Sequence, residues 1–238
     1  MSEHPTILIT GGTRRLGKEI ARHYVHLGWR LVLCYLSDVD AAQEARSSLA
    51  SVAKSVRIVQ CDIGDAGQVG AMLNSVAEQE GRLDFLLHNV GLYLPKPALD
   101  VTPDDWLRAI NANLNGGFYC AHHGLPLLRA SRGLLGFMGY SGLEAVRADP
   151  EAMDYQVSKA GLLSLVRTLG VAYGPLGVRV AMVSPGQMAN SVDLPQSAQS
   201  IPIPRWGTAQ DLCQAWDYLL SASYVTGVNI DVAGGFRL

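Results

Sequence analysis

Two residues of this chain have the types and the spacing that proton transfer requires. Tyr155 and Lys159 are four positions apart, so they face the same side of a helix. A phenol has an ordinary pKa near ~10 and is a poor acid at neutral pH. A nearby ammonium group favours the phenolate, and we expect Lys159 to lower the pKa of Tyr155. Tyr155 is therefore a candidate to pass a proton to a carbonyl or imine. The alternative is that Tyr155 and Lys159 are an incidental pair on a solvated helix face.

A second group of residues, near the start of the chain, is suited to binding a pyrophosphate. The apolar stretch 6–10 leads into a turn that contains Gly11 and Gly17, and residues 18–24 have the pattern of a helix start. The backbone N–H groups of such a turn and the positive end of the helix dipole face the same point. Glycines carry no Cβ, so a phosphate can approach their backbone closely. The order predicts a dinucleotide site, although the motif alone does not exclude a plain strand–helix turn.

Composition and charge limit the class of protein. The 238 residues are 48% hydrophobic and 17% charged, which is typical of one globular α/β domain. The net charge of −2 and the scattered basic residues give no reason to expect nucleic acid or an anionic membrane as a partner. We also find no basic leader and no apolar run of the ~20 residues that cross a bilayer.

The cysteines and histidines do not indicate a metal. The four cysteines are far apart and have no CxxC spacing; Cys34 and Cys61 end apolar runs, which is typical of buried thiols. The neighbours His122 and His123 would point about 100° apart on a helix, which makes a poor metal pair. We expect a chain with no metal site that works in a reducing cytoplasm.

Strands and helices alternate along the whole chain. Apolar runs predict strands at 7–10, 30–35, 56–61, 84–88, 133–139, 179–184 and 228–232. Helices are predicted at 15–27, 40–51, 67–80, 106–122, 152–173 and 208–221. This alternation predicts a single domain over 1–238 with a doubly wound, Rossmann-type parallel sheet of about seven strands and helices on both faces. Ligands then bind beyond the carboxyl ends of the strands, and we expect residues 187–205 to form a mobile flap over the substrate.

In this order the motifs resemble the short-chain dehydrogenase/reductase family over nearly the whole chain. The matching segments are Thr10-Gly11 with Gly17, Asp62, His88-Asn89-Val90-Gly91, Asn111-Ala112-Asn113-Leu114, Tyr155 with Lys159-Ala160-Gly161, Ser184-Pro185-Gly186, Arg205-Trp206-Gly207, and Tyr224-Val225-Thr226-Gly227 with Gly234-Gly235. Agreement at so many ordered positions is not expected by chance.

The resemblance implies a role for each matched residue. Tyr155 is implied to be the proton donor, Lys159 to lower its pKa and hold the nicotinamide ribose, and Asn113 to anchor a water in a proton relay. Asp62 matches the acid that contacts the adenine, and Pro185-Gly186 matches a turn near the nicotinamide. The full set of implied cofactor contacts is Gly11, Thr13, Arg14, Arg15, Leu16, Gly17, Ser37, Asp62, Ile63, Asn89, Gly91, Tyr155, Lys159, Pro185 and Gly186.

The catalytic serine of the family has no exact match. The serine usually stands 13 residues before the tyrosine, and that position is Gly142 in this chain. Ser141 is one step away and is the candidate if the loop carries an insertion; Tyr140 and Gly139 are further candidates. The alternative for Ser141 is a loop serine that bonds its own backbone.

A second departure is Arg15, which stands where the usual family turn has glycine. The variant turn is similar to that of pteridine reductases and bacterial dihydromonapterin reductases. The stretch Leu87-His88-Asn89 and the ending Gly234-Gly235-Phe236-Arg237-Leu238 are also similar to the latter. In that subgroup the serine is often replaced. An arginine beside the pyrophosphate, such as Arg15, pairs well with phosphate or a flat heterocycle. The alternative is that the Arg15 side chain faces solvent.

The choice of cofactor follows from charge at the end of the strand 30–35. NAD sites place an acid there, whereas this chain has Cys34-Tyr35-Leu36-Ser37 and no acid until Asp38. Arg14 lies where NADP-dependent relatives hold the 2′-phosphate, and Ser37 adds a hydroxyl donor. We therefore expect NADPH as cofactor. Asp38 is the residue against this choice, unless it caps the following helix.

Together these observations predict an NADPH-dependent oxidoreductase that transfers hydride to a small molecule. A dihydropterin or dihydrofolate-type substrate is expected first, and a 3-oxoacyl-[acyl-carrier-protein] or general carbonyl substrate second. Tyr93, Trp106 and Trp206 are aromatic candidates for the pocket, with core packing favoured for Trp106. A non-catalytic NADP-binding sensor is the alternative of another class. The family resemblance implies a homotetramer or homodimer through the helices at 106–122 and 152–173.

Overall fold

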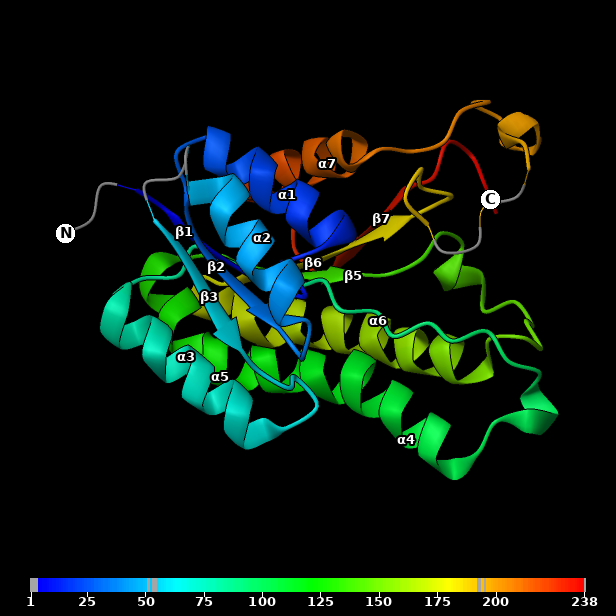
Figure 1. Cartoon of the computed structure of the whole chain (residues 1–238), viewed down its shortest axis with the longest axis horizontal. Helices are drawn as coiled ribbons and strands as arrows, with labels where there is room; N and C mark the ends of the chain where they lie inside the picture. Colours follow the sequence, from blue (N-terminus) through cyan, green and yellow to red (C-terminus); the bar gives the residue numbers. More distant parts are fainter. Residues whose placement is uncertain (1–3, 51, 53–54, 192–193, 195, 238) are drawn as a thin grey trace.

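One parallel sheet organises the computed structural model, which describes residues 4–50, 52, 55–191, 194 and 196–237. Within these residues seven strands pair in the order β3-β2-β1-β4-β5-β6-β7, all parallel (Figure 1). The strands are β1 Thr6–Thr10, β2 Arg30–Tyr35, β3 Val56–Gln60, β4 Phe85–His88, β5 Leu134–Met138, β6 Arg179–Pro185 and β7 Val228–Val232. The predicted doubly wound, Rossmann-type α/β fold is confirmed.

Helices cover both faces of this sheet. One face carries α1 (Arg15–His26), α2 (Val39–Ala50) and α7 (Ala209–Ser221), and the other carries α3 (Ala66–Gln79), α4 (Pro103–Ile110), α5 (Gly116–Ser131) and α6 (Met153–Tyr173) (Figure 1). Each face has its own apolar core, because the central strands are buried on both sides. That double burial explains why the strands are near-continuous apolar runs rather than alternating ones.

Side-chain caps begin several of the helices. Asp65 accepts hydrogen bonds from two backbone N–H groups at the start of α3. Thr102 and Asp105 form a reciprocal capping box at α4, and Thr208 and Asp211 form another at α7. Helix α1 differs, because its N-cap residue Arg14 makes no side-chain cap and its first turn has no acidic residue. The N–H groups of that turn are therefore not taken by a protein side chain.

The single helix predicted over 106–122 is wrong. The chain instead forms α4, a π-helical turn at Asn111–Asn115, and α5, which continues to Ser131 through Pro126. A π turn inserts one extra residue into the helix, which an apolar pattern does not reveal. Close packing accompanies it, since a Cβ on Gly116 would lie 2.9 Å from the Ile63 carbonyl oxygen. Other helix ends differ by a residue or two, and the predicted end at Ser51 lies outside the described residues.

The segment predicted to be a flap, 187–205, lies against the C-terminal end of the sheet. Met188 forms an isolated bridge with Gly207, and Ala198–Ser200 forms a short 3₁₀ turn. Ile203 N donates to the Gly234 carbonyl oxygen at 2.9 Å. Its mobility stays a prediction, and residues 192–193 and 195 lie outside the described part.

Candidate active site

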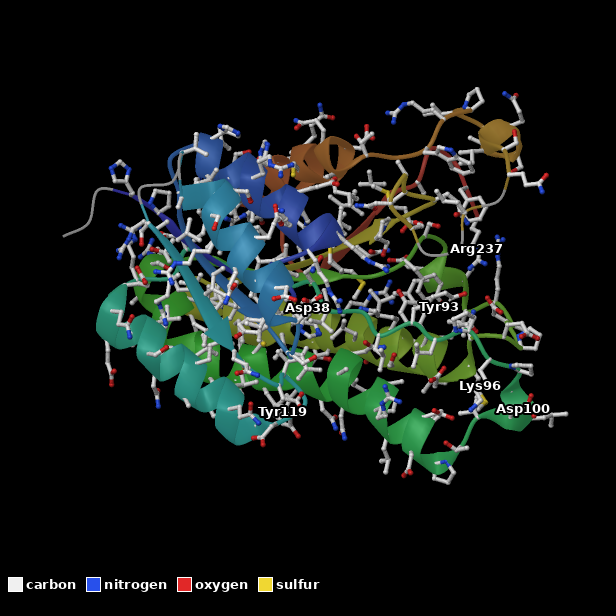
Figure 2. All side chains as sticks on the ribbon, viewed as in Figure 1. Asp38, Tyr93, Lys96, Asp100, Tyr119 and Arg237 are labelled. Atoms are coloured by element: carbon white, nitrogen blue, oxygen red, sulfur yellow. The ribbon has the colours of Figure 1, made fainter. Side chains whose placement is uncertain are left out.

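The predicted site residues gather at the edge where the parallel strands end. Tyr155 and Lys159 come from α6, Asn113 from the π turn, and Asn89 and Gly91 from the segment after β4. Figure 2 shows Tyr93 and Arg237 at this edge of the sheet and Asp38 beyond β2. Groups far apart in sequence are therefore brought together as the topology predicts.

Tyr155 and Lys159 lie on one face of α6, as their spacing predicts. The Lys159 ammonium is 5.8 Å from the centre of the Tyr155 ring. Its Nζ donates to the backbone carbonyls of Met138 at 2.8 Å and Val90 at 3.2 Å, and the side chain is almost fully buried. Gly91 lies beside the pair, where a Cβ would be in ordinary contact with Nζ at 3.5 Å and with Tyr155 Cε2 at 3.8 Å.

Burial sets the protonation of both groups. It lowers the pKa of Lys159 to about 7, because a buried ammonium loses its hydration. Burial, followed by the neighbouring Tyr140 and Tyr93, raises the pKa of Tyr155 above its usual 10. The expected lowering of the Tyr155 pKa is therefore wrong, because burial raises this pKa instead. Tyr155 keeps its proton at neutral pH and is able to donate it.

Aromatic rings surround Tyr155. Its ring centre lies 5.1 Å from that of Tyr93, nearly perpendicular, and 5.7 Å from that of Tyr140, tilted by 36°. With Phe236 and Gly186 these rings line a hollow of about 240 Å³, which we call the catalytic hollow. Tyr93 thus lines the predicted pocket, whereas Trp106 and Trp206 are not among its lining residues.

Asn113 is buried and fully bonded through its side chain. Its amide Nδ2 donates to the Leu92 carbonyl and to Ser158 Oγ, both at 3.0 Å, and its Oδ1 accepts from Leu92 N at 2.7 Å. These bonds tie the π turn to α6 and to the segment after β4. Asn113 therefore holds the walls of the site together, and its implied water-anchoring role stays a prediction.

His88 is a site residue whose role the sequence did not indicate. It is fully buried at the end of β4, and its Nε2 lies 3.1 Å from the Asn113 carbonyl oxygen. A carbonyl only accepts, so Nε2 carries the proton and Nδ1 accepts from Thr10 Oγ1 at 3.4 Å. Burial, followed by the charge of Lys159, lowers the pKa of His88 to about 3. In the sequence, the one feature that could have indicated this role is that His88 is a polar residue at the end of an otherwise apolar strand.

The aligned position Gly142 and the three candidates for the serine role have different surroundings. A Cβ on Gly139 would lie 2.2 Å from Ser184 Oγ, and one on Gly142 would lie 2.7 Å from the Arg237 carbonyl oxygen, so neither position has room for a side chain. Ser141 is buried and its N donates to the Pro185 carbonyl at 2.9 Å. Tyr140 and Ser141 both line the catalytic hollow and stay candidates.

The glycine turn after β1 has the shape of an anion cradle. Gly11 has a left-handed φ of 61°, and a Cβ on Gly17 would lie 2.4 Å from the Gly11 carbonyl oxygen. Asn89 Nδ2 donates to the Thr10 carbonyl at 3.0 Å and so joins the turn to the catalytic side. Arg15 also has a left-handed φ, of 47°, and is exposed. Together with the uncapped first turn of α1, this geometry fits a pyrophosphate.

The end of β2 carries the residues that bear on cofactor choice. Arg14 Nη1 lies 3.3 Å from Asp38 Oδ2. The other oxygen of Asp38 accepts from Ala41 N at 3.0 Å, so Asp38 caps α2, as the alternative interpretation holds. Ser37 is exposed beside them. The Arg14–Asp38 pair and the exposed Ser37 thus stand after β2, where the adenosine ribose of a dinucleotide would lie.

The remaining predicted cofactor residues lie at the same edge. Asp62 and Ile63 follow β3, and Asp62 Oδ1 accepts from Gly64 N at 2.8 Å. Pro185 ends β6, and Gly186 N donates to the Val232 carbonyl at 3.0 Å. Thr13 is buried within the turn and Leu16 packs on the α1 core. Among the described residues no group of His, Cys, Asp and Glu is arranged to hold a metal ion.

Known proteins resemble this chain over nearly its full length. The family model described as Enoyl-(Acyl carrier protein) reductase matches residues 11–237. A 3beta-hydroxysteroid dehydrogenase 1 of Eggerthella lenta is 28% identical, covering 98% of this chain and 94% of its own. A 3-oxoacyl-[acyl-carrier-protein] reductase FabG of Staphylococcus aureus is 26% identical, with 97% of each chain covered.

Solved structures of similar proteins also match this chain over nearly its full length. A short-chain dehydrogenase of Bacillus anthracis has a TM-score of 0.88 at 27% identity and covers 98% of this chain and 97% of its own. A Sinorhizobium meliloti structure at 24% identity has a TM-score of 0.90 over 99% of this chain and 97% of its own, which shows the fold.

The chain belongs to the short-chain dehydrogenase/reductase family of oxidoreductases, whose members use nicotinamide cofactors. The relatives above are steroid, acyl and other dehydrogenases and reductases, and none of them is named as a pteridine reductase. In the described part of the chain, every helix is too short or too polar to span a bilayer.

Proposed function

We propose that this protein is an NADPH-dependent reductase in which Tyr155 gives the proton. The observation that carries the proposal is the protonated Tyr155 phenol in the wall of a hollow, with the Lys159 ammonium 5.8 Å from its ring. A non-catalytic NADP-binding sensor has no need for this buried pair. Burying a lysine costs free energy, so its presence favours an enzyme.

Each residue has a distinct part in this reaction. The glycine turn, Asn89 and the first turn of α1 bind the pyrophosphate, and the nicotinamide, when bound, supplies the hydride. Tyr155 donates its proton to the substrate oxygen or nitrogen as negative charge develops there. Lys159 stabilises the phenolate that Tyr155 leaves, and Asn113 keeps the π turn in register with α6.

NADPH is proposed over NADH because Arg14, the N-cap residue of α1, reaches Asp38 beyond the end of β2. Arg14 and Ser37 stand there, and the nearby Asp38 is engaged with Arg14 and with the α2 N-terminus. A 2′-phosphate would pair with the guanidinium by charge-assisted hydrogen bonds.

A dihydropterin or dihydrofolate-type compound is the proposed substrate. The catalytic hollow is walled by the flat rings of Tyr93, Tyr140 and Phe236, which suit a planar heterocycle. The resemblance of the Arg15 turn to that of pteridine reductases also supports this choice. A 3-oxoacyl thioester is the second candidate, favoured by the similarity to the Staphylococcus aureus FabG.

A substrate comparison tests the proposal. The protein is incubated with NADPH and either 7,8-dihydrobiopterin or acetoacetyl-CoA, and the loss of nicotinamide absorbance is followed. Oxidation with the pterin supports the first assignment, and turnover of the thioester alone contradicts it. Tyr155→Phe should reduce the rate at least 10²-fold in either case, by removing proton transfer, while NADPH binding persists. Turnover of neither substrate, with NADPH bound, would favour the sensor.

Assembly and location complete the proposal. Helices α4, α5 and α6 carry the exposed apolar side chains Leu107, Phe118, Val157 and Val171, which suit contact with another copy. We propose a homodimer or homotetramer formed through these helices, to be checked by light scattering. The four cysteines are unpaired and buried, which is consistent with the proposed cytoplasmic location.

A further inference from the structure

A second hollow adjoins the catalytic one and contains a cation from the end of the chain. It encloses about 150 Å³, and its lining includes Tyr140, Ser141, Arg147, Asp149, Gln156 and Arg237. We call it the tail hollow. Tyr140, Ser141, Asp149, Gln156 and Arg237 also line the catalytic hollow, so the two spaces share a wall. The tail hollow therefore lies directly beside the hollow that Tyr155 lines.

Backbone packing positions Arg237 in this wall. Gly142 has a left-handed φ of 75°, and a Cβ there would lie only 2.7 Å from the Arg237 carbonyl oxygen. Gly142 N also donates to Asp231 Oδ2 at 3.0 Å, which fixes the loop after β5 to β7. The C-terminal residues thus pack directly on the loop that, in the family resemblance, would carry the serine. Figure 2 shows Arg237 on the same side of the sheet as Tyr93.

The guanidinium of Arg237 retains donors for a ligand. Among the described residues, its recorded ionic contact is Asp149, at 3.7 Å, which is too long for a hydrogen bond. Its carbon lies 5.5 Å from the Phe236 ring centre, so the planar group is held against an aromatic face. Asp149 Oδ1 accepts from Glu151 N at 3.2 Å, and Arg147 adds a second positive charge to the lining. Among the described residues, the lining of the tail hollow thus includes two arginines and one aspartate.

We propose that the tail hollow is a subsite for an anionic substituent of the substrate, a carboxylate or phosphate, with Arg237 as its binding residue. Arginine binds such groups through two parallel N–H donors. The inference deepens the proposed function and rests on it, because the reacting carbonyl or imine must lie at Tyr155. The substrate class is then a planar unsaturated compound with an acidic side group on the end away from Tyr155.

The test compares two probes on the same naphthalene frame, one anionic and one neutral. Naphthalene-2-carboxylate and 2-naphthylmethanol are titrated by calorimetry into the protein saturated with NADPH. Wild-type protein should bind the carboxylate at least ten-fold more tightly. Arg237→Gln should remove this difference and Arg237→Lys should restore part of it. Arg129→Gln, an exposed arginine on α5, is the control for net charge and should keep the full difference.

The outcomes separate the inference from the proposed function. Equal affinity for both probes in wild type, binding of neither, or a preference that survives in Arg237→Gln overturns the subsite. Thermal denaturation and NADPH fluorescence on each variant show that the fold and the cofactor site persist. A protein that binds the carboxylate through Arg237 but never oxidises NADPH keeps the subsite and loses the reductase assignment.

Discussion

His88 Nε2 donates its proton to the backbone carbonyl of Asn113 at 3.1 Å, across 25 residues of sequence. The same imidazole accepts from Thr10 Oγ1 at 3.4 Å, and Thr10 Oγ1 in turn accepts from Asn89 N at 3.0 Å. One buried ring thus connects the pyrophosphate turn with the π turn that carries Asn113. His88 therefore adds to Asn89 and Asn113 a buried link between the cofactor side and the catalytic side of the site.

Replacement of His88 should damage both stability and activity. His88→Leu leaves the Asn113 carbonyl without its donor, which costs about 1–3 kcal/mol of unfolding free energy. His88→Gln retains an amide donor and should lose less. Urea denaturation measures the stability, and steady-state rates with NADPH should fall in the same order. Equal rates in both variants and wild type would show that Asn113 does not need this hydrogen bond.

Acid should destabilise the protein through His88. Burial holds its folded pKa at about 3, against an ordinary value near 6.5, so the unfolded chain binds the extra proton over that interval. Unfolding free energy should therefore decrease as pH falls from about 6.5 toward 3. His88→Gln should show a shallower slope in denaturant midpoints over this window. Parallel slopes for the two proteins would contradict the buried neutral imidazole.

Alkali should have the opposite effect through Lys159. Its folded pKa of about 7 lies below its ordinary 10.5, so the unfolded state binds more protons between these values. The stability of the protein without added coenzyme should rise from pH 7 toward 10, below the range in which tyrosines ionise. Lys159→Met, which keeps the length and removes the charge, should flatten this rise. A profile that is already flat in wild type would argue against a desolvated amine.

Tyr140 and Ser141 can be separated by removing one hydroxyl from each. The Tyr140 ring faces Tyr155, whereas Ser141 is buried with its N bonded to Pro185. We expect Tyr140→Phe to lower kcat about ten-fold or more, as loss of a hydrogen bond to the reacting group does. Ser141→Ala should change kcat less than three-fold. The reverse order would assign the serine role to Ser141.

Arg14 should determine the preference for NADPH. Arg14→Ala removes the cation that reaches Asp38 beyond the end of β2, and KM for NADPH should rise by about 10- to 100-fold, the worth of a charged hydrogen bond. KM for NADH should change little. Arg22→Ala, an exposed arginine further along α1, serves as the control. A similar loss for both coenzymes would show that Arg14 does not contact the 2′-phosphate.

The sequence predicted the elements whose signal is local. Apolar runs located all seven strands of the described sheet, and the four-residue spacing correctly placed Tyr155 and Lys159 on one helix face. The position of Asp38 before α2 also indicated that Asp38 could cap this helix, as it does.

What the sequence did not predict depends on contacts between distant segments. His88 was identified only as a strand-end residue, because its partners Thr10 and Asn113 are remote in sequence. The pKa of Tyr155 was assigned the wrong direction, since it is raised by burial and then by Tyr140 and Tyr93, which come from two other segments. The tail hollow depends on Gly142 meeting Arg237, a contact across almost a hundred residues.

The π turn at Asn111–Asn115 makes this stretch intolerant of length changes. Deleting one residue would turn the wide π turn into regular α-helical winding and would change where Asn113 lies relative to the flanking helices. Asn113 would then leave both Ser158 and His88 at once. Natural variants of this protein should therefore gain or lose residues in surface loops while conserving the exact residue count between Ile110 and Gly116.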